Sequence, residues 1–213
     1  MKKAIVTGGA GFIGSHMVDL LIKKKFKAIV IDNFSGGHLK NLEHINKKNI
    51  ILINKDIRSL DIKNKIFKNV DYLFHFAGIG DIVPSIENPK KYMDVNIIGT
   101  VNILELARLN KIKKFIYASS SSCYGLAKTP TSENHKIDPK YPYALSKYQG
   151  EQACFHWAKV YGLKVDSVCI FNAYGPRVRT TGAYGAVFGV FFKQKLENKP
   201  LTVVGNGKQK RDF

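Results

Sequence analysis

Residues Thr7-Gly8-Gly9-Ala10-Gly11-Phe12-Ile13-Gly14 follow a short apolar run, Lys3–Thr7, and carry glycine at every third position from Gly8 to Gly14. This spacing is typical of a turn that joins a β-strand to a helix. Gly8 would make the tight turn, Gly11 would let the backbone approach a pyrophosphate, and Gly14 would let the helix pack closely on the sheet. The pyrophosphate would then lie on the first amides of the helix. A glycine triplet alone is a weak signal, so the surrounding sequence decides.

Apolar, β-branched runs alternate with helical patterns along the rest of the chain. The helical patterns include Ile97, Val101 and Leu104 at helical spacing and a segment from about Tyr143 to Tyr161. The apolar runs show little polar alternation, which favours strands buried on both faces, as in a parallel sheet. The chain is therefore expected to be an α/β protein with a Rossmann-type doubly wound parallel sheet and right-handed crossovers. The predicted strands are Lys3–Thr7, Ala28–Ile31, Ile50–Ile53, Tyr72–Phe76, Phe115–Ala118 and Val165–Ile170.

The strand that follows the glycine turn ends at Asp32. A carboxylate there can accept both hydroxyls of an adenosine ribose and would repel a 2′-phosphate, so we expect NAD rather than NADP. A structural Asx-turn at Asp32-Asn33 is the plainer alternative. Asp56 follows the third strand and could reach the adenine amino group, although such an aspartate is more often a helix cap. His75 is interpreted as a core histidine without a chemical role.

A tyrosine and a lysine four residues apart, Tyr143 and Lys147, open the long predicted helix and share one of its faces. A nearby ammonium and a positive nicotinamide ring would favour the phenolate and lower the tyrosine pKa from about 10. The run Ser119–Ser122 directly follows the fifth strand, where a hydroxyl faces the ligand crevice of a parallel sheet. Together these residues predict a site that removes a proton from an alcohol.

Composition narrows the alternatives. The formal net charge is +18, but the lysines are scattered along the sequence, so nucleic acid is not expected as a partner. The sequence contains no stretch of 18 apolar residues that would predict a membrane span, and its short apolar start does not resemble a signal peptide. We therefore expect a cytoplasmic protein without a membrane partner. Cys123, Cys154 and Cys169 match no metal or redox spacing. They are expected to be reduced thiols, Cys123 with a packing role, and no metal site is predicted.

These motifs, in this order, resemble the extended short-chain dehydrogenases, specifically the NAD-dependent epimerase/dehydratase family. The resemblance covers essentially the whole chain and extends to Asn96–Thr100, Phe171–Arg177 and Gly207–Phe213. It implies that Ser120, Tyr143 and Lys147 are catalytic, with Tyr143 as general base and Lys147 on the nicotinamide ribose. It also implies that Ser120, Tyr143, Asn172 and Arg211 bind a nucleotide sugar, Arg211 at its diphosphate. We expect the NAD site to comprise Gly8, Gly11, Phe12, Ile13, Gly14, Asp32, Asn33, Ser35, Gly36, Asp56, Ile57, Phe76, Ala77, Tyr143, Lys147 and Phe171.

The serine run separates activities within this family. Dehydratases carry Asp and Glu after the catalytic Ser or Thr, and decarboxylases carry a Glu where Ser122 stands; here Ser121 and Ser122 occupy these positions. The resemblance therefore implies a nucleotide-sugar 4-epimerase, acting on a UDP-sugar. Tyr143 would take the proton of the 4-hydroxyl while hydride passes transiently to NAD, through a 4-keto sugar.

The domain division follows from a change of composition after the sixth strand. Residues 1–171 are expected to form the NAD-binding domain with the catalytic residues, and 172–213 the start of a substrate-binding lobe. In that lobe we expect a loop over 172–186, a helix over 187–197 and a short strand at Leu201–Val204. The chain stops at Arg211-Asp212-Phe213, so the lobe is expected to be incomplete.

Two further readings stay open at this point. One is another NAD-dependent nucleotide-sugar dehydratase or reductase. Another is a catalytically silent NAD(H)-binding module, because of the incomplete lobe. Homodimer formation through residues 97–109 and 143–161 is a further expectation, which periodicity cannot distinguish from helices packing on the sheet.

Overall fold

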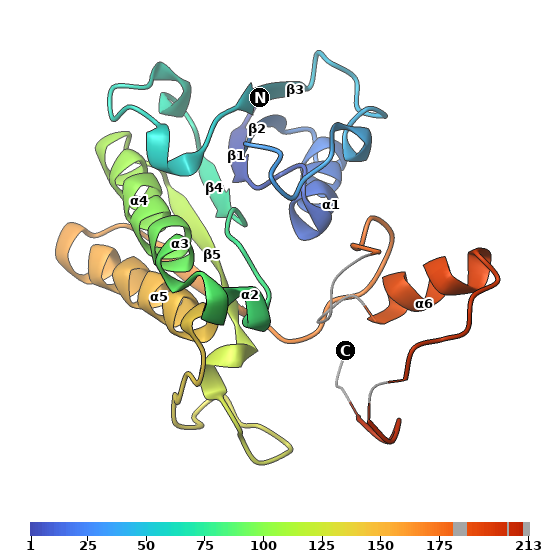
Figure 1. Cartoon of the computed structure of the whole chain (residues 1–213). Helices are drawn as coiled ribbons and strands as arrows, with labels where there is room; N and C mark the ends of the chain where they lie inside the picture. The colour runs from blue at the N-terminus through green and yellow to red at the C-terminus, as the bar shows by residue number, and fades with distance from the viewer. Residues whose placement is uncertain (181–186, 204, 211–213) are drawn as a thin grey trace.

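The computed structural model describes residues 1–180, 187–203 and 205–210. Its sheet is parallel throughout and has six strands in the order β3-β2-β1-β4-β5-β6 (Figure 1). Because the chain changes direction across the sheet between β1 and β4, the carboxyl ends of these neighbours open a crevice. The strands are β1 (Lys3–Thr7), β2 (Lys27–Asp32), β3 (Ile50–Asn54), β4 (Tyr72–His75), β5 (Lys114–Ser120) and β6 (Val165–Ile170).

Helices cover both faces of this sheet, which confirms the Rossmann-type prediction. Helix α1 (Phe12–Lys23) lies on one face, and α4 (Gly99–Leu109) and α5 (Pro142–Tyr161) lie on the other (Figure 1). The short helices α2 (Ile82–Glu87) and α3 (Pro89–Met93) precede α4, and α6 (Val187–Leu196) follows the sheet. None of the helices in the described residues is long and apolar enough to cross a membrane.

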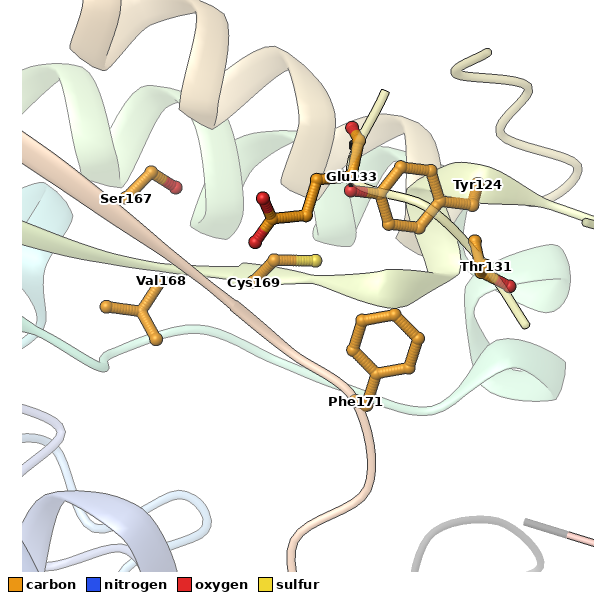
Figure 2. A pocket seen from close by; sticks show the side chains of 7 residues that line it. All are labelled: Tyr124, Thr131, Glu133, Ser167, Val168, Cys169 and Phe171. Atoms are coloured by element: carbon orange, nitrogen blue, oxygen red, sulfur yellow. Dashed lines mark hydrogen bonds between the residues drawn. The ribbon is translucent and has the colours of Figure 1, made fainter. Parts of the chain in front are cut away.

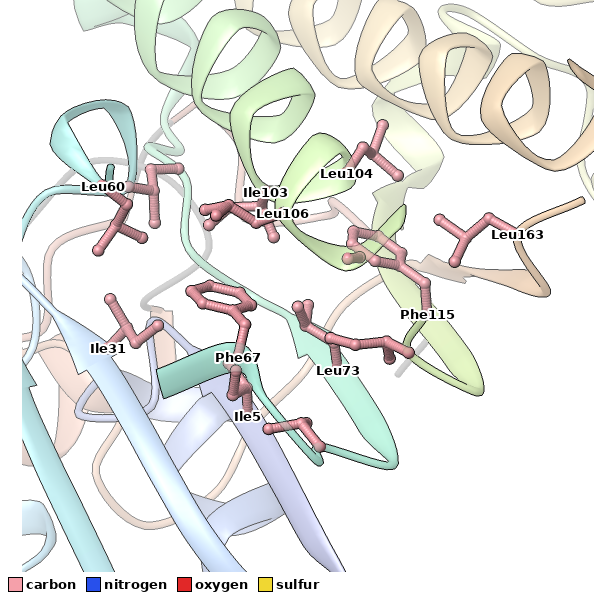
Figure 3. Close-up of a cluster of buried hydrophobic side chains, with 14 of the residues drawn as sticks. Ile5, Ile31, Leu60, Phe67, Leu73, Ile103, Leu104, Leu106, Phe115 and Leu163 are labelled. Carbon is pink, nitrogen blue, oxygen red and sulfur yellow. The ribbon is translucent and has the colours of Figure 1, made fainter. Parts of the chain in front are cut away.

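Two apolar clusters hold these layers together. The smaller one packs α1 on the sheet, with Val18 against Val6 and Val30. The larger one fills the space under α4 and α5 (Figure 3). Continuous burial on both faces explains why the central strands read as unbroken apolar runs. Labelled members of the larger cluster are Ile5, Ile31, Leu60, Phe67, Leu73, Ile103, Leu104, Leu106, Phe115 and Leu163.

The helical run from Pro89 to Leu109 contains an irregular turn. Between α3 and α4, residues Asp94–Ile98 form a π-helical segment, and the backbone continues directly from one helix into the next. The wider turn holds Asn96, whose side chain is buried. Such single π-turns are often found at functional sites.

Two details of the prediction were wrong. Strands β3 and β6 lie at the edges of the sheet, and their side chains are half-buried or exposed, so burial on both faces is limited to the central strands. Residues Leu201–Val203 form no strand, and Val204 lies outside the described residues.

We expect Leu73→Ala to lower the free energy of unfolding by about 2–5 kcal/mol, because the side chain is fully buried between layers and its removal leaves a cavity. Chemical denaturation followed by circular dichroism measures this change. Leu20→Ala is the matched control, since Leu20 on α1 is 47% exposed and its loss should have a small effect. Equal effects of both substitutions would contradict the described core.

Candidate active site

The turn after β1 forms an open cradle at the amino end of α1. Gly8 has a positive φ of 67°, and a Cβ on it would lie 2.7 Å from the backbone nitrogen of Ala77. A Cβ on Gly14 would collide with the carbonyl oxygen of Gly8, so the helix approaches the turn more closely than any other residue would allow. The N-cap, Gly11, offers no side chain, and no acidic residue stands in the first turn of α1.

The first amides of α1 are therefore available to an anion. The Ser15 N–H donates to the Gly11 carbonyl at 3.0 Å and begins the helical pattern. The preceding N–H groups of Phe12, Ile13 and Gly14 have no helical partner by geometry, and the helix dipole makes this end positive. The cradle thus fits the pyrophosphate of a dinucleotide, as the sequence predicts.

Asp32 lies beside this cradle and is 7% exposed. Its two carboxylate oxygens accept the N–H groups of Ala10 at 2.9 Å and Phe34 at 2.8 Å. The Ala10 bond ties the end of β2 to the glycine turn. A carboxylate has about four acceptor sites, so further acceptor positions remain for ribose hydroxyls. The Asx-turn to Phe34 and the ligand role are compatible.

Asn33, Ser35 and Asp56 form a polar network next to Asp32. The Asn33 amide donates to Asp56 Oδ2 at 3.0 Å, and the Ser35 hydroxyl donates to Asn33 Oδ1 at 2.7 Å. Asp56 also caps the short 3₁₀ helix Ile57–Ser59 and accepts two side-chain bonds from Arg58. These bonds to Arg58 lower the pKa of Asp56 to about 2. Asp56 is therefore ionised, and its carboxylate already accepts hydrogen bonds from Arg58.

Two other residues expected at the cofactor have structural roles. The side chain of Ile57 is 5% exposed and belongs to the larger apolar cluster, so only its backbone could face a ligand. Phe76 is half-buried and packs against the smaller cluster. Ala77, by contrast, lies against Gly8 and donates its N–H to the Thr7 hydroxyl at 3.3 Å.

His75 is held by hydroxyl groups on both sides. Its Nδ1 is 2.7 Å from Thr7 Oγ1, and its Nε2 is 2.9 Å from Thr100 Oγ1. The Thr100 hydroxyl donates its proton to the Asn96 carbonyl, so it must accept from the protonated Nε2. Burial lowers the pKa of His75 to about 3, and the Lys147 charge acts in the same direction. The ring is a neutral core histidine, as the sequence indicates.

Asn96 joins this core to the catalytic helix. Its amide donates to the Ser146 hydroxyl at 2.9 Å and to the Ile79 carbonyl at 3.0 Å, and its Oδ1 accepts the Ile79 N–H at 2.9 Å. The side chain therefore fixes both the loop after β4 and the first turns of α5. This places α5 against the crevice.

The structure brings Ser120 and Tyr143 together at the carboxyl end of β5. The Tyr143 hydroxyl donates to Ser120 Oγ at 3.4 Å, a long hydrogen bond, and the Ser122 N–H donates to the same oxygen at 3.2 Å. The Tyr143 ring packs edge-on against Tyr92 of α3, with ring centroids 6.3 Å apart. A hydroxyl pair of this kind can hold an alcohol and exchange a proton with it.

Lys147 lies one helical turn further along α5 and is 9% exposed. Its Nζ lies 4.4 Å from the centre of the Tyr117 ring, and the Tyr117 hydroxyl donates to the backbone carbonyl of Lys147 at 3.1 Å. Burial lowers the pKa of Lys147 to about 8. The ammonium is thus still the main form at neutral pH but is poorly hydrated.

The prediction that Lys147 and a positive nicotinamide ring together lower the pKa of Tyr143 concerns the site with NAD bound, whereas the chain by itself shifts this pKa upward. Burial raises the pKa of Tyr143, and the hydrogen bond with Ser120 opposes this rise only in part. The Lys147 ammonium lies over the Tyr117 ring and is not among the groups that shift the pKa of Tyr143. A phenolate at this position therefore needs positive charge that comes with a ligand.

The remaining predicted residues lie along the segment that leaves β6. Phe171 is 46% exposed and, with Tyr124, lines a pocket of about 450 Å³ beside β6 (Figure 2). Asn172 is half-buried in the next position, and Arg211 lies outside the described residues. Cys123 is buried, its thiol donates to the Ala144 carbonyl at 3.5 Å, and burial raises its pKa to about 11, in keeping with packing.

Contacts with α1 anchor the segment after β6 over the cradle. The Arg177 guanidinium pairs with Asp19 at 2.8 Å, and His16 Nε2 contacts the Pro176 carbonyl at 3.0 Å. A Cβ on Gly175 would meet the ring of Phe12 at 3.7 Å. The start of the expected substrate lobe is thus held beside the dinucleotide cradle.

Arg179 is a residue of this site that the sequence analysis missed. Its Nη1 lies 3.3 Å from Asp81 Oδ2, in the loop after β4. A Cβ on Gly36 would lie 2.5 Å from its Nη2, so the guanidinium also lies against the loop after β2. Arg179 therefore spans the crevice between two strand ends. Its position beside Arg177 in a glycine-rich loop was the available signal.

Comparisons with known proteins agree with this geometry. The model of the NAD dependent epimerase/dehydratase family matches residues 4–213. Among curated proteins, one from Methanocaldococcus jannaschii, provisionally named UDP-glucose 4-epimerase, is 41% identical over 98% of this chain and 68% of its own length.

Solved structures are similar over the same extent. A UDP-N-acetylglucosamine 4-epimerase from Methanobrevibacter ruminantium, in complex with UDP-N-acetylmuramic acid, has a TM-score of 0.94 and 37% identity, covering 100% of this chain and 68% of that one. A UDP-glucuronic acid 4-epimerase from Bacillus cereus, in complex with UDP-glucuronic acid and NAD, has a TM-score of 0.90 and 34% identity, covering 99% of this chain and 68% of that one.

We expect Lys147→Met to stabilise the fold by up to about 3 kcal/mol near pH 7, because it removes a charge that burial disfavours. The pKa of Lys147 in the folded protein lies below its unfolded value of 10.5. The cost of burying the charged side chain is therefore complete below about pH 8. This penalty disappears as the pH rises from about 8 toward 10.5. Urea denaturation of both proteins across this range measures the difference.

The matched control for this measurement is Lys159→Met, an exposed lysine of the same helix. It should change stability little at any pH. If Lys147→Met lowered stability at neutral pH, the described burial of the ammonium would be wrong.

Proposed function

The chain belongs to the NAD dependent epimerase/dehydratase family, and on this premise we propose that it is a UDP-sugar 4-epimerase. NAD is the cofactor. The relatives described above include 4-epimerases of three different UDP-sugars. They support 4-epimerase activity but favour no particular sugar. We further propose that residues 1–171 hold the cofactor and the catalytic groups and that 172–213 begin the substrate lobe.

One observation carries the proposal. Ser120 and Tyr143 meet by hydrogen bond at the carboxyl end of β5, in the crevice that also opens onto the glycine cradle. Ser121 and Ser122 follow in a short 3₁₀ turn, at the positions where a carboxylate would be needed for elimination or decarboxylation. A site with a proton acceptor and serine in place of a carboxylate at both of these positions suits reversible oxidation at one carbinol carbon.

Each residue then has a defined task. Ser120 would hold the sugar 4-hydroxyl, and Tyr143, as phenolate, would take its proton and later return it. Lys147 would contribute positive charge and bind the nicotinamide ribose. Bound NAD supplies the acceptor and donor of hydride. Because burial raises the pKa of Tyr143, the charge of the loaded site has to favour the phenolate before the tyrosine can act.

The cofactor contacts are proposed on the same geometry. The free amides of Phe12, Ile13 and Gly14 would bind the pyrophosphate, and Asp32 would accept the adenosine ribose hydroxyls. Asn33, Ser35, Gly36 and Asp56 would border the adenosine, while Ala77 and Phe171 would border the nicotinamide half. For the sugar nucleotide we propose Asn172 and Arg211, together with Arg179, which already lies across the crevice.

Two helix faces support the expectation of a homodimer. Ile98 at the start of α4 and Phe155 on α5 are 56% and 46% exposed. Pairing with a second copy would cover them. This stays a prediction, to be read from the molar mass in solution.

The direct test is incubation with UDP-glucose, UDP-N-acetylglucosamine and UDP-glucuronic acid, with chromatographic separation of the 4-epimers. We expect the NAD-loaded protein to convert one of these UDP-sugars into a mixture of its 4-epimers, without loss of water or carbon dioxide. A 4-keto-6-deoxy product would favour a dehydratase. Tight NAD binding with no product from any sugar would favour a silent NAD-binding module.

Tyr143→Phe should lower epimer formation by about a hundred- to ten-thousandfold, the usual contribution of general-base catalysis. The fold should be unaffected, because only the hydroxyl in a long hydrogen bond is lost. Tyr148→Phe, five residues further along α5, is the control and should leave the rate unchanged. Retained activity in Tyr143→Phe would remove this residue from the mechanism.

Asp32→Asn should weaken NAD binding by roughly ten- to a hundredfold, because charge-assisted bonds to the ribose hydroxyls are lost. NADP binding should be weakened less, so the preference for NAD should narrow. Calorimetric titration with both dinucleotides measures the ratio, and Asp61→Asn on an exposed loop is the control. An unchanged ratio would mean that Asp32 serves only the turn around Ala10 and Phe34.

A further inference from the structure

Lysines that are scattered in the sequence gather at the amino edge of the sheet, opposite the crevice. All six strands begin at a lysine or shortly after one. Most of these side chains are exposed, and only those of Lys3, Lys27 and Lys114 are half-buried. The set comprises Lys2, Lys3, Lys23, Lys24, Lys25, Lys27, Lys47, Lys48, Lys68, Lys111, Lys113, Lys114 and Lys164.

Backbone hydrogen bonds hold these strand starts side by side across the whole sheet. Neighbouring strands lie about 4.8 Å apart, which is less than the Debye length of about 8 Å at physiological salt. The potentials of adjacent lysines therefore add. The bonds are Ala28 N–H to Asn49 O at 3.0 Å, Lys27 to Lys2 at 2.9 Å, Asp71 to Lys3 at 2.9 Å, Lys113 to Asp71 at 3.0 Å, and Phe115 to Lys164 at 2.8 Å.

Helix capping explains only part of this set. Cations are favourable after the carboxyl end of a helix, and Lys24 follows α1 while Lys111 follows α4. Lys47, Lys48 and Lys68 follow no α-helix and still lie at the same edge. Like charges that gather at one edge repel one another, and this repulsion lowers the stability of the fold. Helix capping alone therefore does not explain why these lysines lie together.

Ion pairs neutralise few of these lysines. Two aspartates at the strand starts, Asp71 and Asp166, pair with Lys113 at 2.7 Å and with Lys114 at 2.6 Å. The edge as a whole keeps an excess of positive charge.

A pocket of about 410 Å³ opens at this edge between the ends of α4 and α5. Lys111, Lys113, Lys164 and Arg108 line it together with Tyr161. The Arg108 guanidinium stacks on the Tyr161 ring at 4.9 Å. Arg108 also pairs with Glu105, and Lys113 pairs with Asp71. Lys111 and Lys164 therefore supply the positive charge of this pocket that suits the phosphate of a lipid headgroup.

We propose that the amino edge of the sheet docks this protein on an anionic phospholipid bilayer. Lysines, as strongly hydrated point charges, suit diffuse attraction to a charged surface, whereas base recognition in nucleic acids relies on bidentate arginine. Leu109 and Tyr161 are 45% and 49% exposed beside the lysines and can enter the headgroup region. The crevice at the opposite edge stays open.

This contact is peripheral and needs no spanning segment. The proposal departs from the expectation, drawn from the sequence, that no membrane is a partner. That expectation rested on the lack of an apolar span and of a signal peptide, neither of which a peripheral contact requires.

The test is co-sedimentation of the whole chain with vesicles at physiological salt. We expect binding to vesicles of equal parts phosphatidylcholine and phosphatidylglycerol, release by high salt, and little binding to phosphatidylcholine alone. Each lysine near such a surface contributes about fivefold to partitioning. The combined variant Lys24→Gln, Lys48→Gln, Lys111→Gln and Lys164→Gln should therefore lower it by on the order of a hundredfold or more.

A second quadruple variant separates this edge from net charge. Lys40→Gln, Lys91→Gln, Lys128→Gln and Lys136→Gln remove the same charge from exposed positions in connections that leave the carboxyl ends of strands. It should bind vesicles within about threefold of the parent. Melting curves confirm that both variants fold.

Three results would overturn the proposal. One is the absence of binding to anionic vesicles, and another is an equal loss in both variants, which would assign binding to net charge. The third is displacement from the vesicles by RNA at equal phosphate concentration, which would assign the edge to nucleic acid.

Discussion

The missing side chain at Gly14 sets the geometry on which the candidate active site depends. A methyl group there would overlap the carbonyl oxygen of Gly8, so α1 can begin this close to β1 only with glycine. The approach aims the first amides of the helix into the crevice between β1 and β4. It also brings Ala10 within reach of Asp32, so the same turn that receives a pyrophosphate positions the carboxylate for a ribose.

A buried chain of hydrogen bonds links this cradle to the catalytic helix. It runs from Thr7 through His75 and Thr100 to Asn96, and from the Asn96 amide to Ser146 beside Tyr143. All these polar groups are satisfied, which is the condition under which buried networks rigidify a fold. The end of β1 and the start of α5 are therefore held in one frame, although 136 residues separate Thr7 from Tyr143.

Much of this could be predicted from the sequence, because buried parallel strands leave continuous apolar runs and their carboxyl ends must meet at one edge. That reasoning finds the sheet, the glycine cradle and the meeting of Ser120 with Tyr143. It fails where an outcome depends on tertiary neighbours. The pKa of Tyr143 depends on burial that Tyr92 and other packed groups create, and Arg179 reaches the crevice through an irregular loop whose path the sequence does not define. The gathering of lysines likewise depends on strand order, which separates sequence neighbours and joins distant residues.

The π-helical turn at Asp94–Ile98 makes the length of this helical run critical. The wide turn accommodates one residue more than a regular α-helical turn, so the helix beyond it keeps its orientation. Removing one residue would restore regular α-helical winding and leave Ile103 and Leu106 facing the core, but Asn96 would lose its position between two loops. The extra residue therefore serves the crevice without disturbing the apolar packing of α4. An aligned homologue with a gap at this point would be expected to keep the core and reorganise the polar contacts around Asn96.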